Sequence, residues 1–372
     1  MINAYAHVFG YLGYQIHSRK FFQALNRKHP VCLTPLQENI LRVGVEPDIH
    51  DMVARQKNIS LNDPAIILAY GNEFHKGRGS CTIGYTVFEY TKLPHDWLNL
   101  MHQIDTVWTT SSWGKDVLVR NGIPPERIGI VPEGVDPFMY RPREREEKHG
   151  AFRFLSVGKW EKRKGQAELL RAWAEVFRGV KDVELVVSWH NPFLTDFSVE
   201  NEIRKLNLGT MPPITLVGNI PHEQAMAELY ASADAFVLPT RGEGWGLTIM
   251  EAMASGLPVI TTRYSAITDY AHDDIAYLID VERMVPVHDE PFFPVPGEQG
   301  EWAEIDYEQL KELLWHVYTH RDEARCTGLK ASKEVLNKWT WDHAAEKALA
   351  LLHDKLRFSE DERGGRVCRQ TV

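Results

Sequence analysis

The sequence predicts an α/β protein built from two doubly wound parallel sheets. Short apolar segments alternate with longer amphipathic segments along most of the 372 residues, which is the pattern of strands wrapped by helices. This length suits two domains of about 150 residues each. Glycine-rich turns follow several expected strands, at the sheet edge where doubly wound folds bind ligands.

The first half of the chain is expected to form an N-terminal Rossmann-like domain over residues 1–140. Its first strand, near 2–9, precedes a turn with glycines at 10–13 and a helix near 15–28. The remaining expected elements are strands near 31–34, 65–70, 82–87, 106–109 and 128–131, and a helix near 113–121.

A charged run, RPREREEKHG at 141–150, has no apolar face and is expected to be a solvated linker. A C-terminal Rossmann-like domain follows over 151–338. Its expected strands lie near 152–157, 183–188, 214–217, 235–238 and 259–262, and its helices near 166–178, 222–232, 247–254, 307–319 and 321–336. The proline-rich stretch 284–305 is expected to be a long surface loop, and the polar tail 358–372 to be frayed.

Composition limits the classes of function. A hydrophobic content of 44% and a charged content of 25% are ordinary for a soluble globular protein, and a net charge of −9 argues against nucleic acid as the main partner. The four cysteines are scattered without a CxxC pair, which indicates reduced thiols. The sequence has neither a long apolar run nor a signal-peptide pattern at Met1, so a cytoplasmic location is expected.

The segment RGEGWGLTIMEAMASG, 241–256, places two carboxylates around a glycine-rich turn. Glycines at every second position let a ligand approach the backbone closely, and the helix starting near Leu247 offers free N–H groups, beside which Thr248 adds a hydroxyl. Glu243 would face whatever these groups hold. Glu251, in the helix, could accept hydrogen bonds from a vicinal diol such as a ribose, or could lie on an exposed stripe.

A second loop, GKWEKRKG at 158–165, crowds four cations after an expected strand of an acidic protein. Fixed cations at the carboxyl end of a strand suit a diphosphate, although a solvated basic loop remains an alternative. The N-terminal turn, FGYLGYQIH, is a weaker signal. Neither a GxGxxG fingerprint nor a GxxxxGK[ST] loop occurs, which argues against ordinary dinucleotide and P-loop sites.

Together these segments resemble a known family. Residues 239–260, PTRGEGWGLTIMEAMASGLPVI, resemble the E-x7-E signature of retaining GT-B glycosyltransferases of family 4. GKWEKRKG resembles the phosphate loop of that family, and VPEGVDPFMYRP, IGYTVFEYTKLP and TSSWGKDVLVRNGI resemble further segments of it. The resemblance implies two Rossmann-like domains facing across a cleft, with a C-terminal helix over 339–357 packing back on the N-terminal domain.

The resemblance also assigns roles to individual residues. Glu243, Lys159 and Lys164 are expected to be catalytic, with Glu243 on the hydroxyls of the donor sugar and the lysines on the diphosphate. The expected donor-binding residues are Gly13, Gly158, Arg163, Gly244, Trp245, Gly246, Leu247, Thr248 and Glu251. Tyr14 and Glu89 are assigned to the acceptor side. No metal and no cofactor are expected, because cationic side chains and a helix dipole can stabilise the leaving diphosphate.

Two positions depart from the family pattern. Lys159 stands where the family usually has arginine, which keeps the charge and loses the bidentate fork. Many members carry a histidine in the neighbourhood where this chain has Phe88 and Glu89. These departures leave the donor preference and the acceptor side open.

The expected function is that of a retaining, metal-independent glycosyltransferase of the hexosyltransferase type (EC 2.4). It would move a sugar from a UDP- or GDP-sugar to a hydroxyl of a glycan, lipid-linked or small-molecule acceptor. Two alternatives stay open: another enzyme on this fold, such as an epimerase or a phosphorylase, and a non-catalytic partner subunit that binds sugar nucleotide or glycan. The basic amphipathic segment 15–28 leaves peripheral contact at the inner membrane face as a further alternative.

Overall fold

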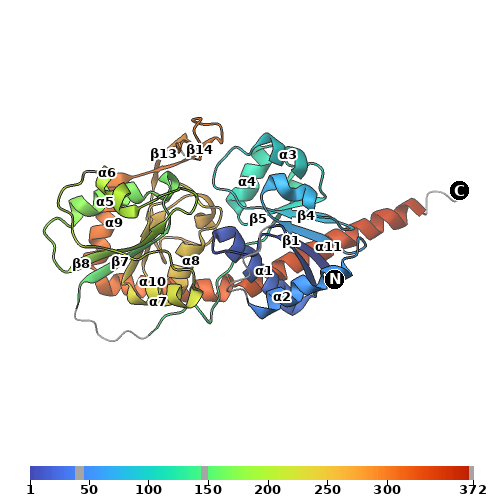
Figure 1. Ribbon diagram of the computed structural model, residues 1–372, viewed down its shortest axis with the longest axis horizontal. Helices are drawn as coiled ribbons and strands as arrows, with labels where there is room; N and C mark the ends of the chain where they lie inside the picture. The colour runs from blue at the N-terminus through green and yellow to red at the C-terminus, as the bar shows by residue number, and fades with distance from the viewer. Residues whose placement is uncertain (38–45, 144–149, 291, 368–372) are drawn as a thin grey trace. The chain divides into compact units, whose positions relative to one another are not determined.

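The computed structural model describes residues 1–37, 46–143, 150–290 and 292–367, and the chain divides into two compact units (Figure 1). Unit 1 comprises Met1–Val87, Pro94–Gly134 and the chain from Thr340 onward. Unit 2 comprises Phe88–Leu93 and Val135–Trp339. Most of the expected linker lies outside the described residues. The longer part of unit 2 begins at Val135, ahead of the expected boundary. The shorter part, Phe88–Leu93, comes from within the expected N-terminal domain.

Unit 1 is built on a parallel six-stranded sheet with the strand order β2-β1-β3-β4-β5-β6. Because the first strand lies inside the sheet, the chain winds outward in both directions, as doubly wound folds do. The strands are β1 (Ile2–Ala6), β2 (Val31–Pro35), β3 (Ala65–Leu68), β4 (Thr82–Tyr85), β5 (Thr106–Thr109) and β6 (Ile128–Ile130). The helices are α1 (Gly13–Lys28), α2 (Pro47–Ala54), α3 (His95–Met101), α4 (Ser112–Arg120) and α11 (Trp341–Val367).

The last helix, α11, packs beside α1, in agreement with the expected return of the C-terminal helix to the N-terminal domain (Figure 1). Arg27 of α1 pairs with Asp342 at 2.8 Å, while Ala344 and Ala348 are buried. The helix continues well into the expected frayed tail. In α1 itself, Phe21 and Phe22 are fully buried, so its amphipathic pattern has one face in the core of unit 1.

Unit 2 repeats the scheme with the strand order β12-β11-β10-β7-β8-β9, again all parallel. Its strands are β7 (Phe152–Lys159), β8 (Val183–His190), β9 (Ile214–Leu216), β10 (Ala235–Leu238), β11 (Val259–Thr262) and β12 (Tyr277–Ile279). Its helices are α5 (Gln166–Val176), α6 (Val199–Lys205), α7 (Glu223–Ser232), α8 (Leu247–Ala254), α9 (Tyr307–Thr319) and α10 (Arg321–Lys338).

Both faces of the unit 2 sheet are buried. On β10, Phe236 and Leu238 join the hydrophobic cluster of α8, while Ala235 and Val237 join the cluster of α5 and α9. This burial explains why the strand is continuously apolar rather than alternating. Because β7 and β10 are parallel neighbours, the loops that leave their carboxyl ends start side by side.

The prediction of a long surface loop over 284–305 was wrong at both ends of this range. An antiparallel ribbon forms there from β13 (Val281–Pro286) and β14 (Glu301–Ile305). Proline is tolerated at the last position of a strand, and β13 carries polar side chains that masked its pairing. Within unit 2 this ribbon also contacts the segment 88–93, because the Glu301 N–H of β14 donates to Thr91 Oγ1 at 2.8 Å.

Candidate functional site

Two loops meet at the carboxyl ends of β7 and β10. The loop after β7 contains a single 3₁₀ turn, Lys162–Lys164, which ends at Gly165. Gly165 has φ +71°, and a Cβ there would lie 2.2 Å from the carbonyl oxygen of Pro239 in the other loop. The Arg241 N–H donates to Arg163 O at 2.6 Å. Only glycine permits this close approach, which brings the basic loop onto the glycine-rich turn.

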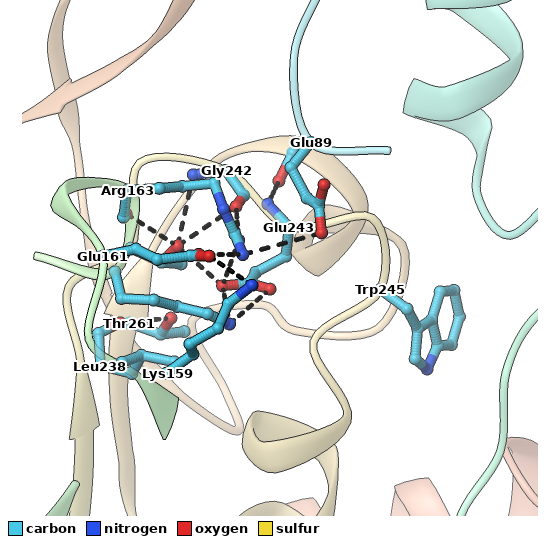
Figure 2. A network of polar contacts seen from close by, with 12 residues as sticks. Glu89, Lys159, Glu161, Arg163, Leu238, Gly242, Glu243, Trp245 and Thr261 are labelled. Atoms are coloured by element: carbon cyan, nitrogen blue, oxygen red, sulfur yellow. Dashed lines mark hydrogen bonds and ion pairs between the residues drawn. The ribbon is translucent and has the colours of Figure 1, made fainter. Parts of the chain in front are cut away.

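Glu243 lies buried at the centre of the resulting network (Figure 2). Its carboxylate accepts hydrogen bonds from Lys164 Nζ at 2.8 and 2.9 Å and from Thr240 Oγ1 at 2.8 Å, and it pairs with Arg163 at 3.2 Å. Burial alone would raise the pKa of Glu243, but Lys164 and Arg163 lower that pKa to about 2. The carboxylate is therefore ionised and held by cations.

Arg163 connects Glu243 to two further carboxylates. It donates to Gly242 O at 2.7 Å and to Glu161 at 3.0 Å, and its guanidinium lies 3.7 Å from Glu89 (Figure 2). Burial alone would lower the pKa of Arg163, yet the three carboxylates raise it above its usual value. Glu89, expected on the acceptor side, is thus grouped with the basic loop of unit 2.

Lys159 ends β7 beside Gly158 and forms an ion pair with Glu161. Its Nζ also lies over two aromatic rings, 4.7 Å from the centre of Phe193 and 5.9 Å from that of Phe292. A carboxylate and two rings therefore restrict an ammonium group that would otherwise move freely on its stem.

The glycine-rich turn ends at Gly246, which caps α8 with φ +98°. A Cβ at Gly246 would lie 2.9 Å from Tyr270 Oη, so a larger residue would disturb the start of the helix. Leu247 and Thr248 form the first turn of α8 and are half-buried. Within the described part of the chain, Thr248 Oγ1 is buried without a hydrogen-bond partner. Gly244, on the buried side of the same turn, makes further contacts of its own.

Glu251 is buried, which excludes the exposed stripe considered from the sequence. Its Oε2 accepts a hydrogen bond from Tyr230 Oη at 3.0 Å, and Tyr140 also bonds to this carboxylate. Burial raises the pKa of both tyrosines, and the charge of Glu251 adds to the effect. Two phenols therefore hold the Glu251 carboxylate in place inside unit 2.

Trp245 does not line the site as expected. Its side chain is buried, donates to Met250 Sδ at 3.3 Å, and packs against Tyr270 and Trp339. Figure 2 shows the ring standing apart from the polar network. The aromatic ring anchors the turn in the hydrophobic core of unit 2, and donor binding at this position, through the backbone of the turn, stays a prediction.

Gly13 and Tyr14 belong to unit 1, where Gly13 opens α1. The Tyr14 hydroxyl donates to Val87 O at 2.7 Å and accepts from Val87 N–H at 2.9 Å. Tyr14 therefore tethers the chain just after β4. The two residues assigned to the acceptor side fall into different units, since Glu89 lies in unit 2.

Three residues of the network were not singled out from the sequence. Glu161 lies inside the basic loop, where its charge could have been weighed against the four cations. Thr240 ends the strand segment before the turn. Ser265 has φ +59° and its Oγ accepts the Glu243 N–H at 2.8 Å, a contact with no signal in the sequence.

The described residues contain no group of three or more His, Cys, Asp or Glu side chains arranged to hold a metal ion. The carboxylates of the network instead face Lys and Arg. In the same described residues, every helix is too short or too polar to cross a bilayer.

Comparison with known proteins agrees with this architecture. Residues 151–289 match the family described as Glycosyl transferases group 1. The MMP alpha-(1->4)-mannosyltransferase of Mycolicibacterium hassiacum is 26% identical over 256 residues, covering 67% of this chain and 54% of that protein. D-inositol 3-phosphate glycosyltransferase 1 of Catenulispora acidiphila is 30% identical over 258 residues, covering 66% and 56%.

The chain thus spans little more than half the length of these two curated relatives. Among solved structures, Anabaena HepE in complex with UDP-glucose superposes with a TM-score of 0.67 at 13% identity, covering 95% of this chain and 99% of that one. Two parallel six-stranded sheets and this likeness define the fold. The chain therefore has the GT-B fold, and its residues 151–289 match the glycosyl transferases group 1 family.

Proposed function

We propose that this protein is a retaining glycosyltransferase that moves a sugar from a UDP- or GDP-sugar to a hydroxyl acceptor without a metal ion. One observation carries the proposal: Lys159, Arg163 and Lys164 converge with the ionised Glu243 at the carboxyl ends of two adjacent parallel strands. Ligands of doubly wound sheets bind at this edge. The named activities of the relatives, and UDP-glucose in HepE, point to the same chemistry.

The cations would bind the diphosphate. Negative charge grows on the leaving diphosphate as the bond to the sugar breaks, so Lys159, Arg163 and Lys164 would interact more strongly with the transition state than with the donor. The N-terminus of α8 adds a positive dipole end at the same edge. This charge stabilisation is the role that magnesium has in other phosphate sites.

The two glutamates would bind the remaining parts of the donor. Glu243 accepts hydrogen bonds only, because it is ionised, and sugar hydroxyls are suitable donors to it. Glu251 would accept hydrogen bonds from the ribose hydroxyls. Gly244 and Gly246 would let the sugar approach the backbone of the turn.

A thermal-shift panel of UDP-, GDP- and ADP-sugars tests donor binding directly. A ligand that binds only the folded protein raises its melting midpoint. We expect one nucleotide to raise the midpoint of the wild type and to have little effect on Glu251→Ala, measured against each variant's own ligand-free midpoint. Glu184→Gln, which alters a part-buried pair with Arg153 outside the network, serves as the control and should keep the shift. No shift with any sugar nucleotide at millimolar concentration would overturn the proposal.

Turnover distinguishes the transferase from the alternatives. The identified donor is incubated with candidate glycan, lipid-linked and small-molecule acceptors, and free nucleoside diphosphate is measured with and without EDTA. Equal rates with EDTA, and a product whose anomeric configuration matches the donor by NMR, support retention without a metal. Donor binding with no product from any acceptor favours the non-catalytic partner subunit, and an altered sugar on the recovered donor favours an epimerase.

A further inference from the structure

Three of the four cations in the basic loop of unit 2 are paired with carboxylates of the same unit. This ion-pair network contains as many carboxylates as cations, and its six side chains are Lys159, Arg163, Lys164, Glu89, Glu161 and Glu243. A loop that only attracted phosphate would carry a clear excess of positive charge. The balance raises the question of what the additional carboxylates do.

Glu161 has a distinct position among these carboxylates. Its Oε1 pairs with Lys159 and its Oε2 accepts from Arg163 at 3.0 Å, so one carboxylate bridges two cations (Figure 2). Its side chain is only 10% exposed. Two phosphate oxygens would use the same two cations in the same bridging manner.

Glu243 is held more firmly than Glu161. Besides its cations it accepts from Thr240 Oγ1, and its backbone N–H donates to Ser265 at 2.8 Å. Glu161 lies instead in the short loop before the 3₁₀ turn, where its carbonyl accepts from the Lys164 N–H at 2.9 Å and its own N–H makes a long hydrogen bond of 3.4 Å to Gln166. Glu161 is therefore the carboxylate that a phosphate could displace at the lower cost.

We propose that Glu161 is an internal anion that competes with the phosphates of the nucleotide for Lys159 and Arg163, and so limits how tightly the protein holds a nucleoside diphosphate. This inference rests on the proposed function and assigns a further affinity-determining residue to the same site. Weakened binding of the leaving nucleoside diphosphate would also favour its release after transfer.

The test is calorimetric titration of wild type and Glu161→Gln with UDP, GDP and ADP, followed by the monophosphate and the nucleoside of whichever base binds. Glutamine keeps the shape and removes the charge. We expect the variant to bind the diphosphate at least about tenfold more tightly, a difference of about 1.4 kcal/mol. The gain in affinity over wild type should be smaller for the monophosphate and absent for the nucleoside.

Two matched variants separate charge from shape. Glu161→Asp retains the charge and should stay within about threefold of wild type, whereas Glu184→Gln removes a carboxylate that pairs with Arg153 at 3.0 Å outside the network and should leave the affinity unchanged. Glu89→Gln removes a one-third exposed carboxylate 3.7 Å from Arg163. It should tighten diphosphate binding by about two- to threefold, and it tests the same competition if Glu161→Gln does not fold.

Equal or weaker diphosphate binding by Glu161→Gln, or by Glu89→Gln where it stands in, overturns the inference while leaving the proposed function intact. An equal gain for the nucleoside also overturns it, because the effect would then not involve phosphate. Failure of every variant and of wild type to bind any nucleotide overturns the proposed function and this inference together.

Discussion

In both units the first strand lies where the strand order reverses, although the two strand orders differ. The turns that follow these two strands hold a buried arginine in different ways. In unit 1, Arg19 of α1 donates to Val8 O at 2.9 Å and to Gly10 O at 2.5 Å in the turn after β1, and its pair with the Glu46 carboxylate is long, at 3.8 Å. In unit 2, Arg163 after β7 is shared among three carboxylates.

The difference lies in what an anionic ligand could replace. Backbone carbonyls are fixed parts of the turn, so Arg19 stabilises the local structure of unit 1. Carboxylate side chains can move, so the cations after β7 can exchange one anion for another. A cation at the end of a strand therefore indicates a binding site only when its partners are exchangeable.

The largest expected effect is on Lys164, which donates to both oxygens of Glu243. Lys164→Met should lower kcat with the identified donor by about 100- to 1000-fold, as the loss of a preorganised charge in an active site does. Steady-state kinetics with the identified donor measure this loss in kcat. Lys205→Met, which removes an exposed pair with Glu202, should retain wild-type rates, and a loss of similar size there would contradict the assignment.

The acid stability of the protein should depend on Glu243. Its pKa lies at about 2 in the folded protein against 4.5 ordinarily. A lowered carboxyl pKa contributes stability that is complete above the ordinary pKa and is lost as the pH falls from about 4.5 to about 2. At about 1.4 kcal/mol per unit this amounts to roughly 3 kcal/mol.

Urea unfolding at a series of pH values between 5 and 2 checks this expectation. Glu243→Gln should be less stable than wild type at pH 5 and should lose less further stability toward pH 2. A wild-type slope in Glu243→Gln would show that other carboxylates cause the acid dependence. Glu184→Gln is the control, and it should follow the wild type.

Arg19→Met tests whether the buried arginine of unit 1 has a structural role only. The substitution leaves buried carbonyls of the turn without their donor, so we expect a loss of about 2 kcal/mol in the free energy of unfolding. Nucleotide affinity, measured by titration calorimetry, should change less than twofold. A large loss of affinity at unchanged stability would place Arg19 in the binding site and remove the contrast with Arg163.

Gly165→Ala tests the close approach of the two loops in unit 2, and the quantity compared is the difference between this variant and a matched glycine variant. Both Gly165 and Gly179 have positive φ, +71° and +81°, but a Cβ at Gly179 meets no atom within 4 Å. Gly179→Ala should therefore cost only the backbone strain, about 1 kcal/mol. Gly165→Ala should cost about 1–2 kcal/mol more and weaken nucleotide binding, because the added methyl group pushes the two loops apart. Equal melting midpoints for the two variants would contradict the close approach.

Much of the fold was predictable because its signals are local. The apolar runs of β7, β10 and β11 and the turns after them follow from residue order alone, and the structure confirms two doubly wound parallel units. The ribbon of β13 and β14 was missed, since the prolines and glycines of 284–305 have the pattern of a loop, whereas the pairing of the two strands is a tertiary contact. Segment 88–93 was assigned to the wrong unit, because its contacts in unit 2 involve residues about two hundred positions away.

For the site, the sequence by itself determined which loops carry charge and which turn is rich in glycine. Only the tertiary structure decided the partners: Lys164 pairs with a carboxylate 79 residues away, Glu161 bridges two cations, and Trp245 turns into the core. The physical reason is that the type of a side chain and the end of a strand depend on the local sequence. Which side chains form ion pairs depends instead on which strands become neighbours. The adjacency of β7 and β10 arises when the sheet assembles, and it brings two halves of the network together.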